Sequence, residues 1–189
     1  MKIYVIRHGQ TNWNVEGRIQ GKTDIEWNTE GTKQALKIKS IIKDYNIDLI
    51  ISSPLKRARK TAEIINEALN CPIIFDKSLE ERGYGIFEGQ VRKLIKDDII
   101  NSNLLNNYNI NLKYKEIEPL YDLCERVWNL LDNIKRQYNG KNILLVSHGG
   151  TIRAINGYFE GMDNDGLIRN PNLSNCQIKI YEMEQKNDI

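Results

Sequence analysis

The stretch Lys2-Ile3-Tyr4-Val5-Ile6 is followed at once by Arg7-His8-Gly9, and this opening decides the fold. A short run of β-branched and aromatic residues is typical of a buried strand. The same arrangement recurs twice, where residues 49–51 precede Ser52-Ser53-Pro54 and residues 143–146 precede Ser147-His148-Gly149-Gly150. The sequence therefore predicts three strands that each end at polar or reactive residues.

Helical periodicity fills the intervals between these runs. The apolar spacing predicts helices over residues 32–45, 55–69 and 120–138. Pro54 suits the first turn of the second helix, and Pro119 sits where the third would start. Weaker strand patterns occupy residues 73–75 and 177–181. Strands that alternate with helices are typical of an α/β fold, so we expect a three-layer, doubly wound, mostly parallel sheet with helices on both faces. No linker divides the chain, and we expect residues 1–189 to form a single domain.

Composition narrows the class of protein. The chain has 189 residues, a net charge of +2, 40% hydrophobic and 28% charged residues, which is typical of a soluble globular protein. A near-balanced charge predicts neither nucleic-acid nor membrane-surface binding, and no apolar run approaches the ~20 residues that span a bilayer. The apolar run before Arg7 is too short for a signal peptide, so we expect a cytoplasmic protein. The sequence gives no signal of oligomeric state.

The carboxyl ends of the three main strands carry the reactive groups. Ligands of open parallel sheets bind at that edge. If the strands are neighbours, Arg7, Arg57 and the chain's only two histidines, His8 and His148, converge there. Basic groups that gather at helix N-termini form an anion site, most naturally for phosphate.

Two histidines beside arginines could have one of three roles. Metal ligation lacks a third ligand at a characteristic spacing, and the arginines would repel a cation, so we predict no metal and no cofactor. The three cysteines, Cys71, Cys124 and Cys176, are too far apart in sequence to indicate a zinc site or a disulfide framework. Two structural core histidines are a second possibility, although both precede glycine at strand ends. The third is a nucleophilic imidazole that attacks phosphorus, with the other basic groups stabilising the transferring phosphoryl group. Such a reaction needs a carboxylic acid, and Glu80, Glu81 and Glu88 offer one.

Five ordered blocks resemble the histidine phosphatase superfamily, the phosphoglycerate mutase-like proteins. The blocks are Arg7-His8-Gly9-Gln10-Thr11 with Asn14, Ser53-Pro54-Leu55-Lys56-Arg57-Ala58 with Thr61-Ala62, residues 79–89, Val146-Ser147-His148-Gly149-Gly150 and Asn172-Leu173-Ser174-Asn175-Cys176. They cover nearly the whole chain. An isolated Arg-His-Gly triplet is a weak signal, whereas several blocks in the family's order are a strong one.

The resemblance implies a role for each matched residue. His8 would be the nucleophile that becomes phosphohistidine, and Glu81 would protonate the leaving group and then activate water. The remaining site residues would bind the phosphate or line the rim of its pocket: Arg7, Arg57, His148, Asn14, Gln20 and the Gly149 backbone. Glu88 is the alternative acid, but its position favours a helix-start residue. Arg59 and Lys60 are expected on a solvated face.

The resemblance covers both phosphatases and mutases. Arg82 and Tyr84, with Arg92 further on, resemble the mutase loop whose arginine and tyrosine grip a phosphoglycerate. Against a mutase, residues 93–118 contain no arginine, the chain lacks a lysine-rich C-terminal tail, and the Asn175-Cys176 loop is of the phosphatase type. We therefore favour a metal-independent phosphatase of a small phosphomonoester, with a mutase as the alternative. Ribazole phosphate, phosphoserine, a sugar phosphate and phosphoglycerate all remain open as substrates.

Two other classes leave partial signals. Residues 17–23, GRIQGKT, are similar to a nucleotide-binding phosphate loop but are one residue short, because the motif needs glycine at Glu16. A catalytically inactive module that binds phosphorylated ligands is disfavoured, because His8, Glu81 and the other matched positions are intact.

The asparagine-rich residues 101–111 have too few apolar positions for a confident core helix. We interpret them as a solvated loop or frayed helix end. The alternative is a lid or specificity insert over a site.

Overall fold

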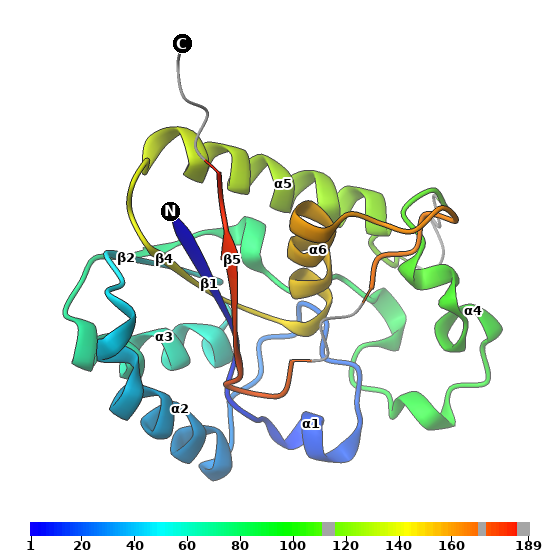
Figure 1. Ribbon diagram of the computed structural model, residues 1–189. Coiled ribbons are helices and arrows are strands. Elements are labelled where there is room, and N and C mark those ends of the chain that lie inside the picture. Colours follow the sequence, from blue (N-terminus) through cyan, green and yellow to red (C-terminus); the bar gives the residue numbers. More distant parts are fainter. Residues whose placement is uncertain (111–115, 170–172, 185–189) are drawn as a thin grey trace.

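Five strands form one sheet in the computed structural model, which describes residues 1–110, 116–169 and 173–184 (Figure 1). They are β1 (Lys2–Arg7), β2 (Leu49–Ser52), β3 (Ile73–Phe75), β4 (Ile143–Ser147) and β5 (Ile178–Glu182). Their order is β3-β2-β4-β1-β5. β1, β2, β3 and β4 are parallel, and β5 pairs antiparallel to β1. The mostly parallel sheet predicted from the sequence is confirmed.

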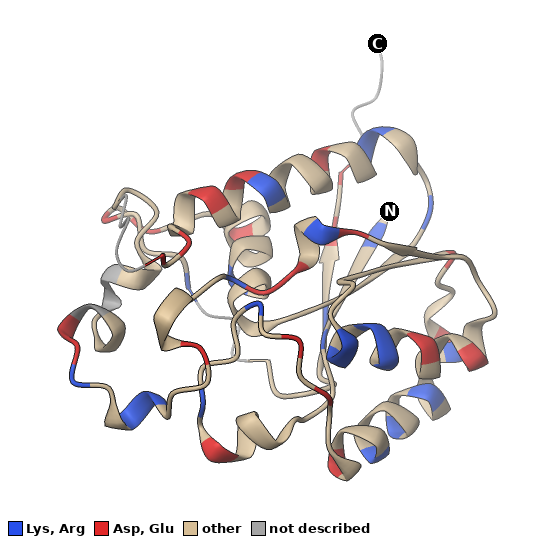
Figure 2. Cartoon of the chain, turned by 180° about the vertical axis from the view of Figure 1, so that it is seen from behind, with Lys and Arg blue, Asp and Glu red and all other residues tan. Residues whose placement is uncertain are grey.

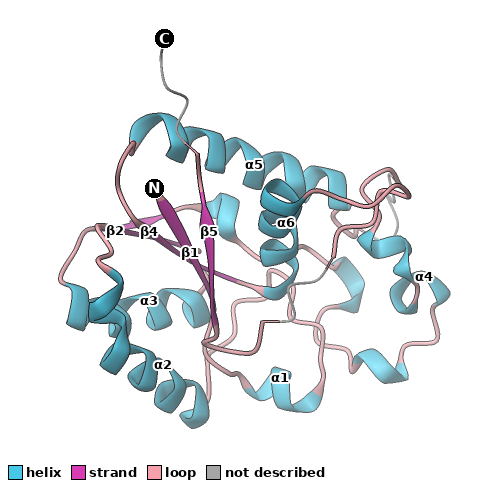
Figure 3. Ribbon diagram, viewed as in Figure 1, coloured by secondary structure: helices cyan, strands magenta, loops and turns pink. Residues whose placement is uncertain are grey.

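Helices connect the strands (Figure 3). The α-helices are α1 (Asn12–Glu16), α2 (Thr29–Ile41), α3 (Lys56–Leu69), α4 (Asp98–Asn101), α5 (Leu120–Gln137) and α6 (Gly149–Glu160). Short 3-10 turns are η1 (Ile42–Tyr45), η2 (Lys77–Leu79), η3 (Gly85–Phe87), η4 (Arg92–Leu94) and η5 (Asn103–Asn106). The predicted helix 32–45 corresponds to α2 with η1, and the other two predicted helices correspond to α3 and α5. Pro54 lies before α3 rather than in its first turn, because Leu55 is the N-cap residue.

Alternate residues of the strands face opposite layers of helices. Ile3 and Val5 of β1 pack in one core cluster with α5 and α6. Tyr4 and Ile6 pack in a second cluster with α2 and α3. Side chains that alternate along a strand point to opposite faces, so a strand buried on both sides must be apolar throughout. The three-layer α/β architecture predicted from the sequence is therefore confirmed.

The register of the central strands brings the reactive residues together. β4 lies between β2 and β1, with Ser52 opposite Val146 and Arg7 opposite Ser147. The three strands consequently end at the same edge of the sheet, which is the convergence that the sequence predicts.

A third, smaller core cluster supports the loops beyond that edge. It contains Ile19, Phe87, Ile95, Ile100, Leu105 and Ile117. Leu105 belongs to the asparagine-rich stretch and is 1% exposed. The interpretation of residues 101–111 as a solvated loop is therefore wrong at Leu105, because this leucine anchors the segment; residue 111 lies outside the described residues.

The outer surfaces of α2, α3 and α5 carry both acidic and basic residues (Figure 2). Cys71, Cys124 and Cys176 are free thiols. None of the helices in the described ranges is both long enough and apolar enough to cross a membrane.

Candidate active site

His8 follows β1 and is held as a neutral imidazole, whose Nε2 has no hydrogen-bond partner among the described residues. Its backbone N–H donates to the Ser147 carbonyl at 2.9 Å, and its ring Nδ1 lies 2.8 Å from the Gly9 carbonyl oxygen. Because a carbonyl only accepts, Nδ1 carries the hydrogen and Nε2 keeps its lone pair. Burial, followed by the charges of Arg57 and Arg7, holds the pKa of His8 well below 6.5, although the Gly9 carbonyl raises it. Nε2 is therefore available as a nucleophile.

His148 precedes α6 and holds the opposite tautomer. Its Nδ1 accepts from Arg57 Nε at 3.2 Å, so its Nε2 carries the hydrogen and donates to Ser53 Oγ at 2.8 Å. The ring centroids of His8 and His148 lie 5.1 Å apart. Burial, followed by the charge of Arg57, also lowers the pKa of His148 well below 6.5. The hydrogen bond from Arg57 to His148 thus fixes the two side chains relative to each other.

Arg57 is fully buried at the start of α3. Its Nη1 donates to the Thr23 carbonyl at 2.8 Å and its Nη2 to the Gly21 carbonyl at 2.7 Å. Three of the five N–H donors of its guanidinium are therefore used by the residues that the structure describes, and these residues leave two unused. The loop over residues 17–23 thus presents the Gly21 and Thr23 carbonyls to Arg57. A nucleotide-binding loop instead presents backbone N–H groups to a phosphate.

Arg7 carries a donor without a partner. Its Nη1 donates to the Leu173 carbonyl at 3.0 Å, and its guanidinium lies beside Gly149, the first residue of α6. Arg7 Nε and Gln20 Oε1 are buried without a hydrogen-bond partner among the described residues. Buried polar atoms in proteins are normally satisfied, so a vacant, buried N–H donor on a half-buried arginine indicates a place for an anionic ligand.

Glu81 caps the first turn of α6. Its Oε2 accepts from the Gly150 N–H at 3.2 Å and its Oε1 from the Thr151 N–H at 3.3 Å. A Cβ atom at Gly150 would lie 2.6 Å from Glu81 Oε1, so the carboxylate needs glycine at this position. Because glycines are poor helix formers, α6 gives no clear signal in its first residues, and the sequence analysis did not predict it.

Glu88 has a structural role, but it is not the helix-start role expected from the sequence. It follows η3 and starts no helix. Its carboxylate accepts from the backbone N–H groups of Lys22, Thr23 and Tyr84 at 2.9–3.0 Å, and from Thr23 Oγ1 at 2.6 Å. Glu88 therefore fastens the loop whose carbonyls hold Arg57, and the helix-start interpretation is wrong.

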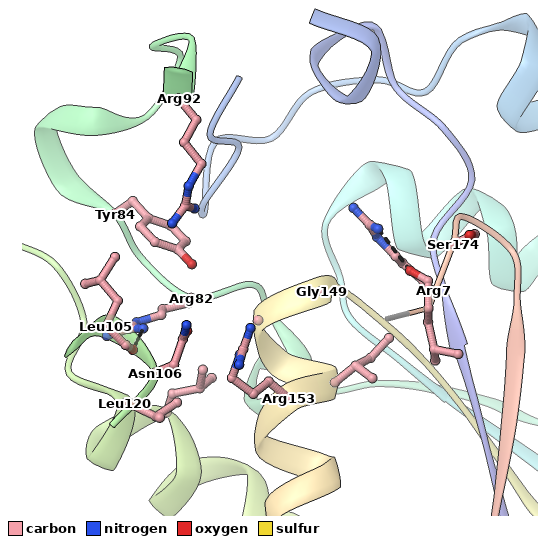
Figure 4. A pocket seen from close by; sticks show the side chains of 14 residues that line it. Arg7, Arg82, Tyr84, Arg92, Leu105, Asn106, Leu120, Gly149, Arg153 and Ser174 are labelled. Atoms are coloured by element: carbon pink, nitrogen blue, oxygen red, sulfur yellow. Dashed lines mark hydrogen bonds between the residues drawn. The ribbon is translucent and has the colours of Figure 1, made fainter. Parts of the chain in front are cut away.

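His8 and Glu81 line the same hollow, of about 270 Å³, which Asn14 and Gln20 also line. Asn14 Oδ1 accepts from the Thr11 N–H at 3.0 Å, so its amide nitrogen is the group that can donate to a ligand. A second hollow, of about 530 Å³, is lined by residues that include Arg82, Gly149 and Arg153 (Figure 4). The two hollows share Arg7, Tyr84 and Arg92 and are therefore adjacent.

The structure gathers all ten predicted site residues at these hollows or at the histidine pair. Arg82 is 2% exposed, and its guanidinium donates to the Glu118 carbonyl at 2.6 Å and to the Leu105 carbonyl. It therefore holds a wall of the larger hollow in place. The roles of the ten residues in binding and catalysis stay predictions.

Sequence reasoning missed two groups that hold the backbone at His8 and Gly9. Thr61 Oγ1 accepts from the Gly9 N–H at 3.0 Å, and Asn175 Nδ2 donates to the His8 carbonyl at 2.8 Å. Both residues fall in the matched blocks, but only three-dimensional contact reveals their task. Asn172, from the last of those blocks, lies outside the described residues. Among the residues that the structure describes, no group of three or more His, Cys, Asp or Glu side chains could hold a metal ion.

The profile of the histidine phosphatase superfamily (branch 1) matches residues 3–188, and the chain belongs to this family. It is 36% identical to the uncharacterized phosphatase PhoE of Bacillus subtilis over 97% of this chain and 90% of that protein. It is 33% identical to the probable phosphoglycerate mutase GpmB of Escherichia coli, over 98% of this chain and 86% of that protein. The structure of Bacillus stearothermophilus YhfR aligns with a TM-score of 0.84 and 26% identity, over 97% of this chain and 91% of that one.

Proposed function

We propose that the chain is a metal-independent phosphomonoester hydrolase that acts on a small phosphorylated metabolite through a phosphohistidine at His8. One observation carries the proposal. The Gly9 carbonyl fixes His8 with its hydrogen on Nδ1, and the unprotonated Nε2 lies beside arginines that still have vacant N–H donors. A neutral nucleophile next to preorganised positive charge is the arrangement that phosphoryl transfer needs.

In the first half of the reaction, His8 Nε2 forms a bond to phosphorus while the bond from phosphorus to the leaving oxygen breaks. Arg7 and Arg57 stabilise the negative charge on the equatorial oxygens. Glu81, in its protonated form, gives its proton to the leaving oxygen, which departs as an alcohol. The products of this half are phosphohistidine, the free alcohol and the Glu81 carboxylate.

In the second half, the Glu81 carboxylate removes a proton from a water molecule that attacks phosphorus. The bond from phosphorus to Nε2 breaks, inorganic phosphate leaves, and His8 returns to its neutral form. Because Glu81 accepts hydrogen bonds from the first turn of α6, its carboxylate is held at one place for both proton transfers.

Phosphoglycerate mutase-type transfer is the second candidate, because relatives named as probable mutases share about a third of the sequence and Tyr84 and Arg92 line both hollows. The relative named as a phosphatase is somewhat more similar. The two candidates differ in the fate of the phosphohistidine. A phosphatase passes the phosphoryl group to water, whereas a mutase returns it to the substrate.

The test is turnover of 4-nitrophenyl phosphate in the presence of a chelator, followed by a panel of phosphorylated metabolites. We expect release of inorganic phosphate without added metal, and inhibition by vanadate, a mimic of the five-coordinate transition state. Activity that requires a divalent metal would contradict the mechanism. With 3-phosphoglycerate, isomerisation that outpaces phosphate release would identify a mutase.

A further inference from the structure

The peptide group between His8 and Gly9 is held at both of its polar atoms by side chains from distant parts of the chain. Its carbonyl, that of His8, accepts from Asn175 Nδ2 at 2.8 Å. Its N–H, that of Gly9, donates to Thr61 Oγ1 at 3.0 Å. Thr61 belongs to α3, and Asn175 lies shortly before β5. Two segments that are far apart in sequence therefore hold one peptide group, the one that follows the nucleophile.

Thr61 also joins this peptide group to the start of α3, which carries Arg57. The Thr61 side chain is fully buried, and its hydroxyl donates to the Arg57 carbonyl at 2.7 Å. A hydroxyl has one hydrogen to donate, so toward the Gly9 N–H it acts as the acceptor. A single side chain thus fixes the loop that carries His8 against the helix that carries Arg57.

Asn175 is itself fixed in place. The N–H of the next residue, Cys176, donates to the Arg7 carbonyl at 2.9 Å, which anchors this loop to the end of β1. Asn175 Nδ2 also lies 3.3 Å from Asn14 Oδ1. Both partners of Nδ2 are oxygen acceptors, so the Asn175 amide has one possible orientation, with its nitrogen toward the His8 carbonyl.

The peptide group needs this restraint because Gly9 is a glycine. A Cβ atom at Gly9 would lie 2.8 Å from the Gly31 carbonyl oxygen of α2, so the close approach of α2 requires glycine here. Glycine gives the backbone more conformational freedom than any other residue. The Gly9 carbonyl must nevertheless stay where it accepts from His8 Nδ1 at 2.8 Å, because this hydrogen bond decides which ring nitrogen is left for attack.

We propose that Thr61 and Asn175 are positioning residues for the nucleophile. By holding the His8–Gly9 peptide group from both sides, they keep His8 Nε2 unprotonated and directed toward phosphorus. Neither is among the residues that line the two hollows, so they act through the peptide group and not by contact with the substrate. The kinetic part of this inference rests on the proposed function. A misplacement of about 1 Å can cost about a hundredfold in rate, so the loss of this restraint is large enough to measure.

The first experiment measures single-turnover release of 4-nitrophenol from 4-nitrophenyl phosphate, which accompanies formation of the phosphohistidine. We expect Thr61→Val, which removes the hydroxyl and keeps the shape, to lower this rate at least about tenfold. Thr61→Ser keeps the hydroxyl and should restore most of the rate. The inhibition constant of inorganic phosphate should stay close to the wild-type value in Thr61→Val, because Thr61 lines neither hollow.

A double variant tests whether the two side chains act on the same peptide group. Asn175→Ala should also lower the rate. The loss in Thr61→Val/Asn175→Ala should be smaller than the product of the two single losses, because the second substitution acts on a peptide group that is already released. Tyr181→Phe is the matched control. It removes another buried hydroxyl, which donates to Asn156 at 3.1 Å and lies on β5 opposite Ile3, and should leave the rate unchanged.

A second readout does not depend on turnover. In the wild-type chain, nitrogen-15 NMR should show the His8 hydrogen on Nδ1. In Thr61→Val and in Asn175→Ala we expect a mixture of the two His8 tautomers, with the ring of His148 unchanged. Thermal unfolding shows whether each variant is folded. If Thr61→Val does not fold, Asn175→Ala, which alters a half-buried side chain, supplies both readouts.

The outcomes separate this inference from the proposed function. Turnover by the wild-type chain, with the same single-turnover rate in folded Thr61→Val or Asn175→Ala, would overturn the inference and leave the hydrolase standing. An equal loss in Tyr181→Phe, or single losses that multiply in the double variant, would also overturn it. If the wild-type chain forms no phosphohistidine, the proposed function fails. The NMR readout then decides alone: a mixture of tautomers in the folded variants supports the hold on His8, and a ring identical to that of the wild type overturns it.

Discussion

Stability at mildly acidic pH is a direct probe of the two buried imidazoles. His8 and His148 are the chain's only histidines and are 2% and 0% exposed. Burial, with the charge of Arg57 as the second cause, holds both pKa values well below 6.5 in the folded chain. As the pH falls through 6.5, the unfolded chain takes up two protons that the folded chain does not bind. The contribution of the two neutral histidines to the free energy of unfolding is therefore fully present above this pH. It is lost progressively as the pH falls below it.

The size of the effect follows from the number of imidazoles. Lowering the pH from about 7.5 to about 5.5 should cost roughly 1–2 kcal/mol for each histidine, or about 3 kcal/mol for the pair. Few other side chains titrate in this window. The assay is urea unfolding at the two pH values. In His8→Gln only one imidazole remains, so the loss should fall to about half of the wild-type value.

Two results would refute this reasoning. A wild-type free energy of unfolding that is the same at both pH values would mean that the imidazoles are charged, or free to become charged, in the folded chain. A full loss in His8→Gln would mean that other groups carry the pH dependence.

Three further predictions test the arrangement of the site. Glu81→Gln should slow an alkyl phosphate at least about tenfold more than 4-nitrophenyl phosphate in steady-state assays, because an aryl leaving group hardly needs a proton; equal losses would contradict the assignment of the acid. Gly150→Ala should show the same dependence on leaving group to a smaller extent, since a Cβ there would lie 2.6 Å from Glu81 Oε1; kinetics of the folded variant that match the wild type would count against this positioning. Nitrogen-15 NMR at neutral pH should show two neutral rings of opposite tautomer, with the hydrogen on Nδ1 of His8 and on Nε2 of His148; identical tautomers would be incompatible with the hydrogen bonds described.

The sequence was sufficient to predict the sheet and the meeting of the two histidines. Residues 3–6 and 143–146 are apolar on both faces of their strands, and that pattern has one main explanation, a central parallel strand. The order of the strands then places His8 and His148 at one edge. These features depend on local pattern and on general rules of topology.

The sequence could not predict contacts between distant loops. Glu88 is one residue before a glycine, which suggested a helix start, but its four hydrogen bonds reach back to Lys22, Thr23 and Tyr84. Leu105 lies among asparagines, which suggested a solvated loop, yet it is buried with residues far away in sequence.

The central claim is that His8 accepts the phosphoryl group, and trapping of the phosphoenzyme tests it most directly. The wild-type chain is mixed with a phosphomonoester, quenched in alkali and analysed by intact and tandem mass spectrometry. We predict one added phosphoryl group per chain, located on His8, labile in acid and absent from His8→Ala. A phosphoryl group on another residue, or substrate turnover by His8→Ala at the wild-type rate, would contradict the claim.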